Sequence, residues 1–315
     1  SVKLLIDGVG ACSNFYLIAE KLASNGVDVK IYRPLPWRFD LWPFSLFPRK
    51  GVLKFWYLLS FINQRNHRKL LMIDRRVVWL GSFNISQSHL PKTLGGNNWR
   101  DTAIELQGIN TQNIEVAFSA SWSKWSKKAT ENQLLPSAFL FNFTRALRRS
   151  QRSSLLAKIT SASERVWITN AYFIPDAKLL DALIIASNKG VDVRILLPSN
   201  SDVFFIPWAS SYFYSQLLQA KIRIYEYHEG LLHAKSMLID DWACIGSSNL
   251  NTRSLMHDLE LDYSLQLEES KQQLAHDFME DIHDSNELNQ KNLNQYRFWQ
   301  RYFGGVLLLL ISYWV

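Results

Sequence analysis

One short pattern occurs twice in the chain and constrains its fold more than any other feature. The segment HRKLLMID runs from His67 to Asp74, and HAKSMLID runs from His233 to Asp240. Each is followed at nearly the same distance by Gly-Ser-x-Asn, which ends at Asn84 in the first copy and at Asn249 in the second. A single His-x-Lys is common by chance, but two copies with the same following tetrapeptide indicate a duplicated structural unit.

The similarity between the copies extends beyond these motifs. VDVKIY (27–32) resembles KIRIYEY (221–227), VKLLIDG (2–8) resembles VRILLPS (193–199), and DTAIELQG (101–108) pairs with ELDYSLQL (260–267). Short β-rich runs alternate with segments of helical period, a pattern typical of an α/β fold. In the second copy the pattern predicts helices at 155–163, 177–190 (closed by Gly190) and 208–220, and strands at 165–170 and 191–197.

We therefore expect two α/β repeats joined by a linker. The first repeat covers residues 1–127, the linker 128–152, the second repeat 153–285 and a tail 286–315. Two helices and a strand precede VRILLPS in the second copy, whereas Ser1 alone precedes VKLLIDG. We expect the first repeat to be incomplete at its N-terminus for this reason.

Composition narrows the class of protein. Of the 315 residues, 47% are hydrophobic and 20% charged, which excludes a disordered chain. The formal net charge of +7 favours an anionic partner, with a generic basic surface as the alternative. The two cysteines, Cys12 and Cys244, lack the spacing of ligands or of a disulfide framework, so we expect no metal site and a reducing compartment.

Two segments are rich in apolar and aromatic residues. An insertion at 33–62, absent from the second copy, interleaves aromatic and basic side chains. This composition fits a membrane-interface loop, a stacking surface for single-stranded nucleic acid, or a hydrophobic lid on its own domain. VFFIPWASSYFY (203–214) adds to the same apolar character. The end, VLLLLISYWV (306–315), is too short to span a bilayer and suits an interfacial anchor or a buried terminal helix.

The repeated side chains suit chemistry at phosphorus. A histidine is a competent nucleophile and a good general acid near neutral pH. Side chains alternate along a strand, so a lysine two residues after a histidine points to the same face. Lysines and asparagines then hold phosphate oxygens while one histidine attacks and the other protonates the leaving oxygen. The candidate residues are His67, Lys69 and Asn84 in the first copy, and His233, Lys235 and Asn249 in the second.

We expect two different roles for the acidic residues that the copies share. Alternation places Asp74 and Asp240 on the opposite face from histidine and lysine, so we expect them at strand ends, where they support the site. Asp101 and Glu260 begin matching strands, and either could bond the far nitrogen of a reactive histidine and fix its tautomer. The remaining histidines have no repeated counterpart and are interpreted as structural or surface residues: His89, His228, His257, His276 and His283.

The paired motifs resemble the two HKD motifs of the phospholipase D superfamily, and VKLLIDGVGA, NAYFIPD and GSSNLNTRS resemble its bacterial cardiolipin synthase branch. The resemblance covers about Val2 to Leu267. It implies two α/β/α sandwich repeats related by a pseudo-twofold axis, with one active site at their seam. It also implies metal-independent, cofactor-free transfer through a phosphohistidine, with His67 as nucleophile and His233 as general acid. The residues alone leave that direction open, because both copies carry the same groups.

The resemblance implies a cardiolipin synthase that transfers a phosphatidyl group from phosphatidylglycerol to a second lipid and releases glycerol. We expect it at an anionic membrane surface, the bacterial inner membrane, as a peripheral or interfacially anchored protein. A phospholipase D hydrolase is the close alternative. A nuclease is disfavoured because basic residues are not concentrated along one element, and we expect no nucleic-acid partner. A noncatalytic binding protein predicts loss of a motif histidine or lysine, yet both motifs are intact.

Overall fold

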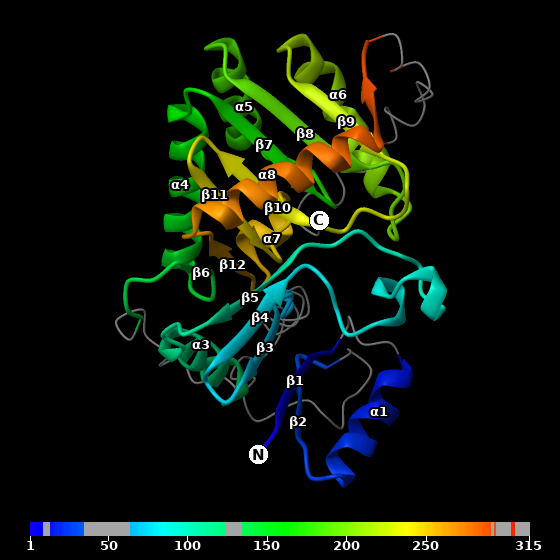
Figure 1. The fold of residues 1–315 in the computed structure, drawn as a ribbon, viewed down its shortest axis with the longest axis vertical. Helices are drawn as coiled ribbons and strands as arrows, with labels where there is room; N and C mark the ends of the chain where they lie inside the picture. Colours follow the sequence, from blue (N-terminus) through cyan, green and yellow to red (C-terminus); the bar gives the residue numbers. More distant parts are fainter. Residues whose placement is uncertain (9–12, 35–63, 124–133, 291–292, 294–303, 306–315) are drawn as a thin grey trace, which may run out of the picture. The chain divides into compact units, whose positions relative to one another are not determined.

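The computed structural model describes residues 1–8, 13–34, 64–123, 134–290, 293 and 304–305 (Figure 1). The chain divides into two compact units. The first comprises Ser1–His67, Asn110–Leu135 and His257–Leu259; the second comprises Arg68–Ile109, Pro136–Met256 and Glu260–Val315. Among the described residues, no helix combines the length and the apolar character needed to cross a bilayer.

The first unit contains a small parallel sheet. Strands β1 (Lys3–Asp7) and β2 (Asp28–Tyr32) pair in parallel and are connected through α1 (Ser13–Ser24), the crossover that a parallel pair requires. Helix α3 (Gln112–Trp122) packs against β2. The Lys30 ammonium links the two elements, because it donates to the Trp122 carbonyl oxygen at 3.1 Å and lies 4.5 Å from the centroid of the Trp122 ring.

The second unit is built on an eight-stranded mixed sheet of order β13-β9-β8-β7-β10-β11-β12-β6. Strands β7, β8 and β9 pair in parallel, and the remaining pairs are antiparallel. The strands are β6 (Phe139–Phe141), β7 (Arg165–Asn170), β8 (Asp192–Pro198), β9 (Arg223–Tyr227), β10 (Lys235–Ile239), β11 (Trp242–Gly246), β12 (Leu261–Ser264) and β13 (Ser285–Leu288).

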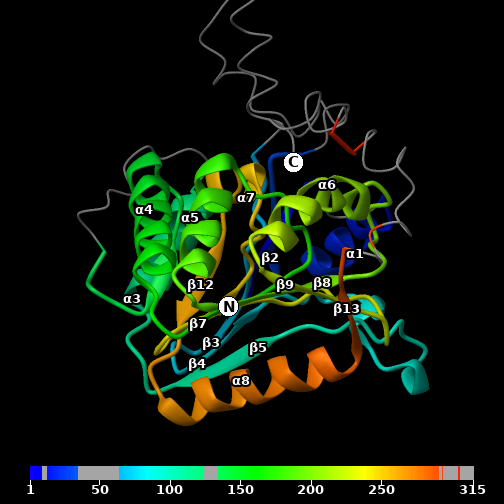
Figure 2. The same ribbon diagram turned by 90° about the horizontal axis from the view of Figure 1, so that it is seen from above.

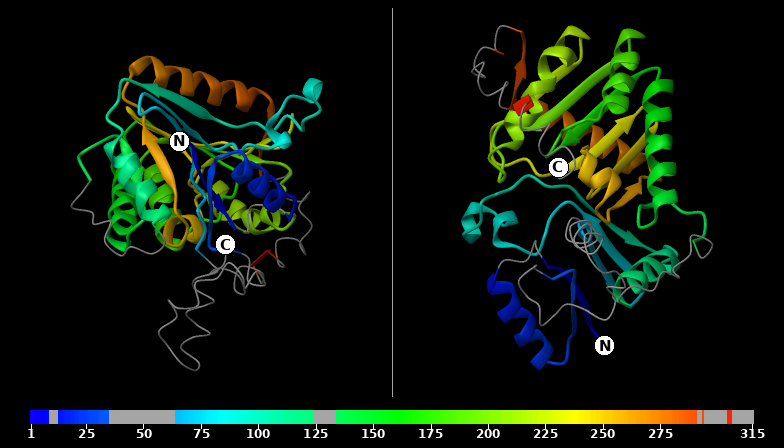
Figure 3. Two further views of the ribbon diagram at one scale, coloured as in Figure 1. Left: turned by 90° about the horizontal axis from the view of Figure 1, so that it is seen from below. Right: turned by 180° about the vertical axis from the view of Figure 1, so that it is seen from behind.

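Helices cover both faces of this sheet. Figures 2 and 3 show α4 (Arg145–Ser161), α5 (Ala177–Asn188) and α6 (Ile206–Gln219) on one face and α8 (Glu268–His283) along the other. Local chemistry sets the helix ends. The Asp176 carboxylate accepts from the Leu179 N–H at 3.0 Å as the N-cap of α5, and Gly190 follows that helix with φ +91°. This arrangement is an α/β/α sandwich.

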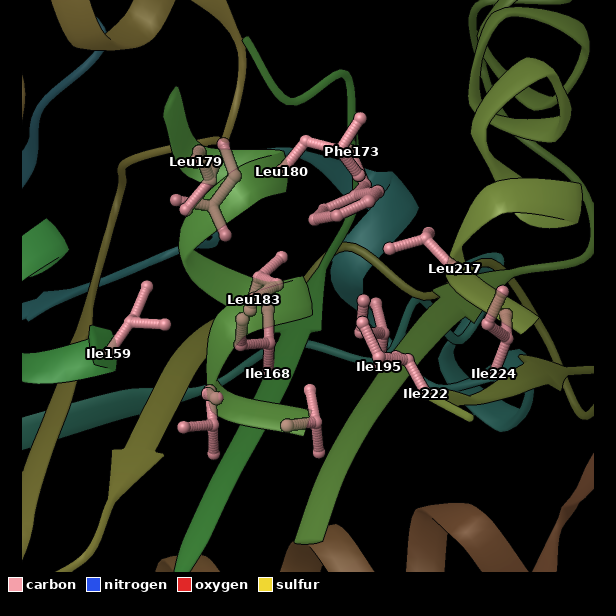
Figure 4. Packing of buried hydrophobic residues seen from close by; sticks show 14 of the residues in the cluster. Ile159, Ile168, Phe173, Leu179, Leu180, Leu183, Ile195, Leu217, Ile222 and Ile224 are labelled. Carbon is pink, nitrogen blue, oxygen red and sulfur yellow. The ribbon is translucent and has the colours of Figure 1, made fainter. Parts of the chain in front are cut away.

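The largest core lies between the sheet and the helices α4, α5 and α6. Ile168, Ile195 and Ile224, from the three parallel strands, point toward Leu183 of α5 and Leu217 of α6 (Figure 4). All five side chains are fully buried. Because helices cover these strands on both faces, the strands contain short continuous apolar runs, as in VWI (166–168) of β7 and ILL (195–197) of β8.

A smaller antiparallel sheet belongs to the same unit. It has the order β3 (Lys69–Ile73), β4 (Val77–Gly81) and β5 (Ala103–Gln107), and β4 contacts β11 and β12. Two 3₁₀ turns, η3 (Gln87–His89) and η4 (Lys92–Leu94), lie between β4 and β5, and the short helix α7 (Thr252–Met256) occupies the matching place after β11.

The predicted α/β class is confirmed, and so are all five elements predicted for the second copy. Helix α4 begins at Arg145, ten residues before the predicted 155 and inside the segment interpreted as a linker. The repeat boundaries and the incomplete start of the first repeat stay predictions. Residues 35–62 of the insertion and the apolar end at 306–315 lie outside the described residues.

Candidate active site

The second motif begins a buried strand. Lys235 is the first residue of β10 and His233 lies two residues before it, and their exposed fractions are 2% and 4%. The Lys235 ammonium donates to the backbone carbonyl of His233. A parallel bridge joins this segment to the one before β5, because the Arg100 N–H donates to Leu231 O at 2.9 Å and the His233 N–H donates to Arg100 O at 2.8 Å. This bridge brings Asp101 to the second motif.

Asp101 fixes the ring of His233. His233 Nδ1 lies 2.9 Å from Asp101 Oδ1, and the Ser82 hydroxyl donates to the same oxygen at 2.7 Å. An ionised carboxylate only accepts, so Nδ1 carries the proton and Nε2 presents its lone pair. The sequence predicts that either Asp101 or Glu260 bonds a reactive histidine. For His233, the carboxylate is that of Asp101. The resulting tautomer is the one needed for attack on phosphorus or for accepting a proton.

The pKa values of both members of this pair lie below their usual values. Burial works to raise the pKa of Asp101, but hydrogen bonds from His233 and His89, the His233 charge and the Ser82 hydroxyl hold it well below its usual range. Burial and then the charge of Lys235 lower the pKa of His233 to about 3, against the opposing influence of Asp101. At neutral pH the pair is therefore a carboxylate and a neutral imidazole.

Two lysines, one from each motif, share this environment. Burial and then the positive charge of Lys69, the first residue of β3, lower the pKa of Lys235 well below its usual value. Lys235 is buried and Lys69 is half-buried, and a bound anion would relieve the repulsion between their charges. The carboxylates Asp101 and Glu260 act in the opposite direction on Lys235.

Glu260 is the counterpart of Asp101 in the second copy. Its exposed fraction is 2%, and the Ser247 hydroxyl donates to its Oε2 at 2.5 Å, while Ser254 donates to Oε1. Burial raises the pKa of Glu260 to about 7, although Lys69, the two serines and Lys235 all act to lower it. The two copies thus each contain a carboxyl group held by the serine of Gly-Ser-x-Asn.

The glycine of Gly-Ser-x-Asn permits this close approach. A Cβ on Gly246 would lie 2.5 Å from Asp262 Cα in β12, and one on Gly81 would lie 2.4 Å from the Thr102 carbonyl oxygen beside β5. Asn249 follows in the second copy, and its Oδ1 is buried with no hydrogen-bond partner within the described part of the chain. Asn84, its counterpart, is exposed.

The motif aspartates lie at strand ends, away from the histidine. Asp240 follows β10 with φ +47° and accepts from the N–H groups of Ser163, Glu164 and Arg165 at 2.9–3.0 Å. It therefore ties β10 to the start of β7. Asp74 follows β3 with φ +49°, at the turn into β4.

His67 belongs to the first unit. Its N–H donates to the Leu259 carbonyl at 2.9 Å, and the neighbouring Arg65 N–H donates to the Asp258 side chain at 2.8 Å. The peptide of His67 is thereby attached to the residue that precedes Glu260 in the chain. Pairing of the His67 side chain with the groups of the second unit stays a proposal.

Sequence reasoning missed Tyr172, Asp202 and His89 as members of this site. The Tyr172 ring lies edge-on to that of His233 at 6.3 Å between centroids, and its hydroxyl donates to Asp202 at 2.6 Å. Burial and the charge of Asp202 raise the pKa of Tyr172 above its usual value. The position of both residues after the carboxyl ends of parallel strands, where α/β proteins bind ligands, was the available signal. His89 also lies here, with its Nδ1 2.5 Å from Asp101 Oδ2.

Two groups of described residues offer three metal-ligand atoms within 4.8 Å of one another: His89 with Asp101 and His233, and His276 with Asp277 and Glu280. In the first group, nitrogen and oxygen atoms lie 2.5 and 2.9 Å apart. Tetrahedral ligands bonded at about 2.1 Å would be separated by roughly 3.4 Å. The first group is therefore a hydrogen-bonded network in this geometry. The second lies on α8, where His276 and Glu280 are exposed.

Residues 155–282 match a family model described as "Cardiolipin synthase, PLD-like domain". The chain is 30% identical over 298 residues to a cardiolipin synthase of Clostridium perfringens, an alignment that covers 89% of this chain and 59% of that protein. It is 31% identical over 301 residues to a cardiolipin synthase of Alkalihalophilus pseudofirmus, covering 91% of this chain and 56% of that protein. The chain belongs to the phospholipase D superfamily. It spans just under three fifths of the length of these relatives.

One solved structure has the same fold as this chain. The phosphatidylserine synthase of Haemophilus influenzae superposes with a TM-score of 0.64 at 12% identity, over 98% of this chain and 88% of that one. The resemblance inferred from the paired HKD motifs is thus confirmed at the level of family and fold.

The low pKa of His233 predicts how stability depends on pH. The unfolded chain binds a proton at this ring near pH 6.5, whereas the folded protein does so near pH 3, so acidification between these values favours unfolding. The wild type should therefore lose stability relative to His233→Gln as pH falls from about 6.5 to about 4.5, by about 1.4 kcal/mol per pH unit at most. Urea unfolding at several pH values measures this difference.

Ser210→Ala is the control, because it removes a hydroxyl that donates to Phe173 O and no titrating group. Its offset from the wild type should be constant with pH. Parallel profiles for the wild type and His233→Gln would show that His233 is not held in its neutral form.

Proposed function

We propose that this chain is the catalytic part of a cardiolipin synthase, which transfers a phosphatidyl group from phosphatidylglycerol to a second phospholipid. The observation that carries the proposal is the neutral, buried His233, oriented by Asp101 and flanked by the charges of Lys235 and Lys69. This set provides a nitrogen base next to a site for a phosphodiester. The cardiolipin synthases to which the chain is similar support the choice of substrate class.

The proposed reaction has two displacements at phosphorus. In the first, a histidine Nε2 attacks the phosphodiester, an N–P bond forms, the P–O bond to glycerol breaks, and the other histidine protonates the glycerol oxygen. In the second, that histidine removes a proton from the hydroxyl of the acceptor lipid, whose oxygen displaces the first histidine. Following the superfamily resemblance, we assign the attack to His67 and the proton transfers to His233.

The lysines and asparagines would act on the phosphate oxygens. Lys69 and Lys235 would stabilise the negative charge that grows on these oxygens in the pentacoordinate transition state. The amide of Asn249 is buried and has an unsatisfied oxygen position, and turning the amide would direct its N–H₂ group there to donate to phosphate. A bound phosphodiester would offset the charge of Lys235 and so raise the pKa of His233 toward the range of a general acid.

Glu260 would perform for His67 the task that Asp101 performs for His233. The hydroxyls of Ser247 and Ser82 hold these two carboxyl groups in the same manner. Asp74 and Asp240 would stabilise the motif strands without touching the substrate. No step in this proposal calls for a metal or an organic cofactor.

We propose further that the protein acts as a peripheral protein on the anionic surface of the bacterial inner membrane. Phe204, 74% exposed, lies just before α6, and its ring packs edge-on against Phe205 and Trp208 at 5.5 and 5.9 Å. Tyr212 of α6 is 54% exposed. The loop before Phe204 holds Asp202, the partner of Tyr172 beside His233. An aromatic surface so close to the site would keep lipid tails in the bilayer while the headgroup reaches the lysines.

Lipid product analysis tests the proposed activity. The full-length protein, incubated with phosphatidylglycerol liposomes with and without EDTA, should yield cardiolipin and free glycerol at equal rates in both samples. His67→Ala or His233→Ala should lower the rate by at least about 10³-fold, because each step needs both histidines. Lipid mass spectrometry identifies the products.

Exposed Gln219→Ala on α6 serves as the matched control and should retain full turnover. Phosphatidic acid without cardiolipin would make the protein a hydrolase. An EDTA-sensitive reaction restored by a divalent ion would refute the metal-free mechanism, and absence of any lipid product would refute a lipid substrate.

Liposome flotation tests the membrane surface. The double variant Phe204→Ser and Tyr212→Ser should bind phosphatidylglycerol liposomes about 10- to 100-fold more weakly, since each aromatic ring would otherwise leave water on binding. Gln216→Ala, an exposed change on the same helix, should bind as the wild type does. Equal binding of the double variant and the wild type would rule out this surface as the membrane contact.

A further inference from the structure

The two copies build the same hydrogen-bond frame around their carboxyl groups. The Ser82 N–H donates to Thr102 O, and the Thr102 N–H donates back to Ser82 Oγ, both at 3.0 Å. In the second copy, the Ser247 N–H donates to Leu261 O at 3.2 Å and the Leu261 N–H donates to Ser247 Oγ at 3.0 Å. The residue before Thr102 is Asp101, and the residue before Leu261 is Glu260, so the two carboxyl groups occupy equivalent positions.

Equivalence continues at the fifth residue after the motif asparagine. The Asn84 N–H donates to His89 Nε2 at 3.2 Å, and the Asn249 N–H donates to Ser254 Oγ at 3.1 Å. His89 Nδ1 then contacts Asp101 Oδ2 at 2.5 Å, as the Ser254 hydroxyl donates to Glu260 Oε1. His89, interpreted from the sequence as a residue without a counterpart, is therefore the counterpart of Ser254.

These contacts fix the tautomer of His89. Because Nε2 accepts the Asn84 N–H, the proton of a neutral ring lies on Nδ1, which donates to Asp101. Asp101 then has both oxygens occupied, one by His89 and the other by His233 and Ser82. The His89 side chain is 9% exposed, and its ring lies 5.1 Å from that of Trp99, which also contacts His233 at 5.4 Å.

The pairs Asp101–His89 and Glu260–Ser254 differ in side-chain length, and within each pair a short side chain is matched with a long one. The first set pairs the short carboxyl side chain of Asp101 with the long imidazole of His89. The second pairs the long side chain of Glu260 with the short hydroxyl of Ser254. Each combination spans a comparable gap between the loop after Gly-Ser-x-Asn and the following strand. A serine at position 89 would fall short of Asp101 but could reach a glutamate.

We propose that His89 is a positioning residue: it holds the second oxygen of Asp101 and so keeps Asp101 aligned on Nδ1 of His233. The role in turnover rests on the proposed phosphatidyl transfer, whereas the alignment itself does not. Losing one hydrogen bond to a carboxylate should lower kcat about 10- to 100-fold in His89→Ala, with KM changed by less than about twofold, because His89 acts through Asp101.

The length compensation provides a double-mutant test. We expect His89→Ser and Asp101→Glu each to lower kcat for cardiolipin formation by the full-length enzyme. The double variant, which reproduces the Ser254–Glu260 set, should recover at least tenfold over the poorer single variant. His283→Ser, a histidine with a 90% exposed side chain, is the control and should keep wild-type kcat.

A second readout is independent of the activity. The Nδ1 proton of His233, bonded to Asp101, should give a downfield proton resonance with a nitrogen shift of the Nδ1–H tautomer. His89→Ala should broaden or shift this resonance, the double variant should restore it, and His283→Ser should leave it in place. This resonance is recorded on the full-length protein labelled with ¹⁵N at histidine.

The outcomes separate the two proposals. A protein without transfer activity whose His233 resonance follows the predicted pattern would overturn the proposed function and support the positioning role of His89. Wild-type kcat in His89→Ser, a double variant no better than either single, or a His233 resonance indifferent to His89→Ala would each overturn the positioning role.

Discussion

The hydrogen bond between Asp101 and His233 is the interaction on which the rest of the site depends. It joins residues 132 positions apart, and it exists because the segment before β5 forms a parallel bridge to the segment before β10. The bond sets the tautomer of His233 and keeps Asp101 ionised despite burial. Without it, a buried imidazole next to Lys235 would have no fixed orientation, and the base of the proposed reaction would lose its direction toward the substrate.

Burial strengthens the interactions between charges in the site, and it also disfavours the charged forms of the site's side chains. His233, Lys235 and Glu260 are each at most 4% exposed, so their ordinary charge states are disfavoured. An anion that interacts with both lysines would compensate for much of this penalty, since interactions between charges strengthen where water is excluded. In the proposed function, the same side chains that destabilise the fold would bind a phosphodiester and stabilise its transition state. This coupling supports a site designed for an anionic substrate.

The helices and strands of the second copy and the motif residues could be predicted from the sequence, because both follow from local rules. Alternation along a strand predicts that His233 and Lys235 share a face, and it predicts the place of Asp240 after β10. Which carboxylate holds His233 depends on a bridge between distant segments, so the sequence left Asp101 and Glu260 equivalent. His89 was missed because comparing the copies looks for identical residues, whereas a hydroxyl and an imidazole perform the same hydrogen bonding at positions 254 and 89.

Trapping a covalent phosphatidyl-histidine tests the proposed two-step mechanism. The full-length protein is mixed with phosphatidylglycerol, quenched during turnover and digested at alkaline pH, where an N–P bond survives. Peptide mass spectrometry then locates the phosphatidyl group. We expect this group on a nitrogen of His67, with His233 unmodified and serving as acid and base. A modified His233 would reverse the two roles, and cardiolipin formation without an adduct on either histidine would contradict a phosphohistidine mechanism.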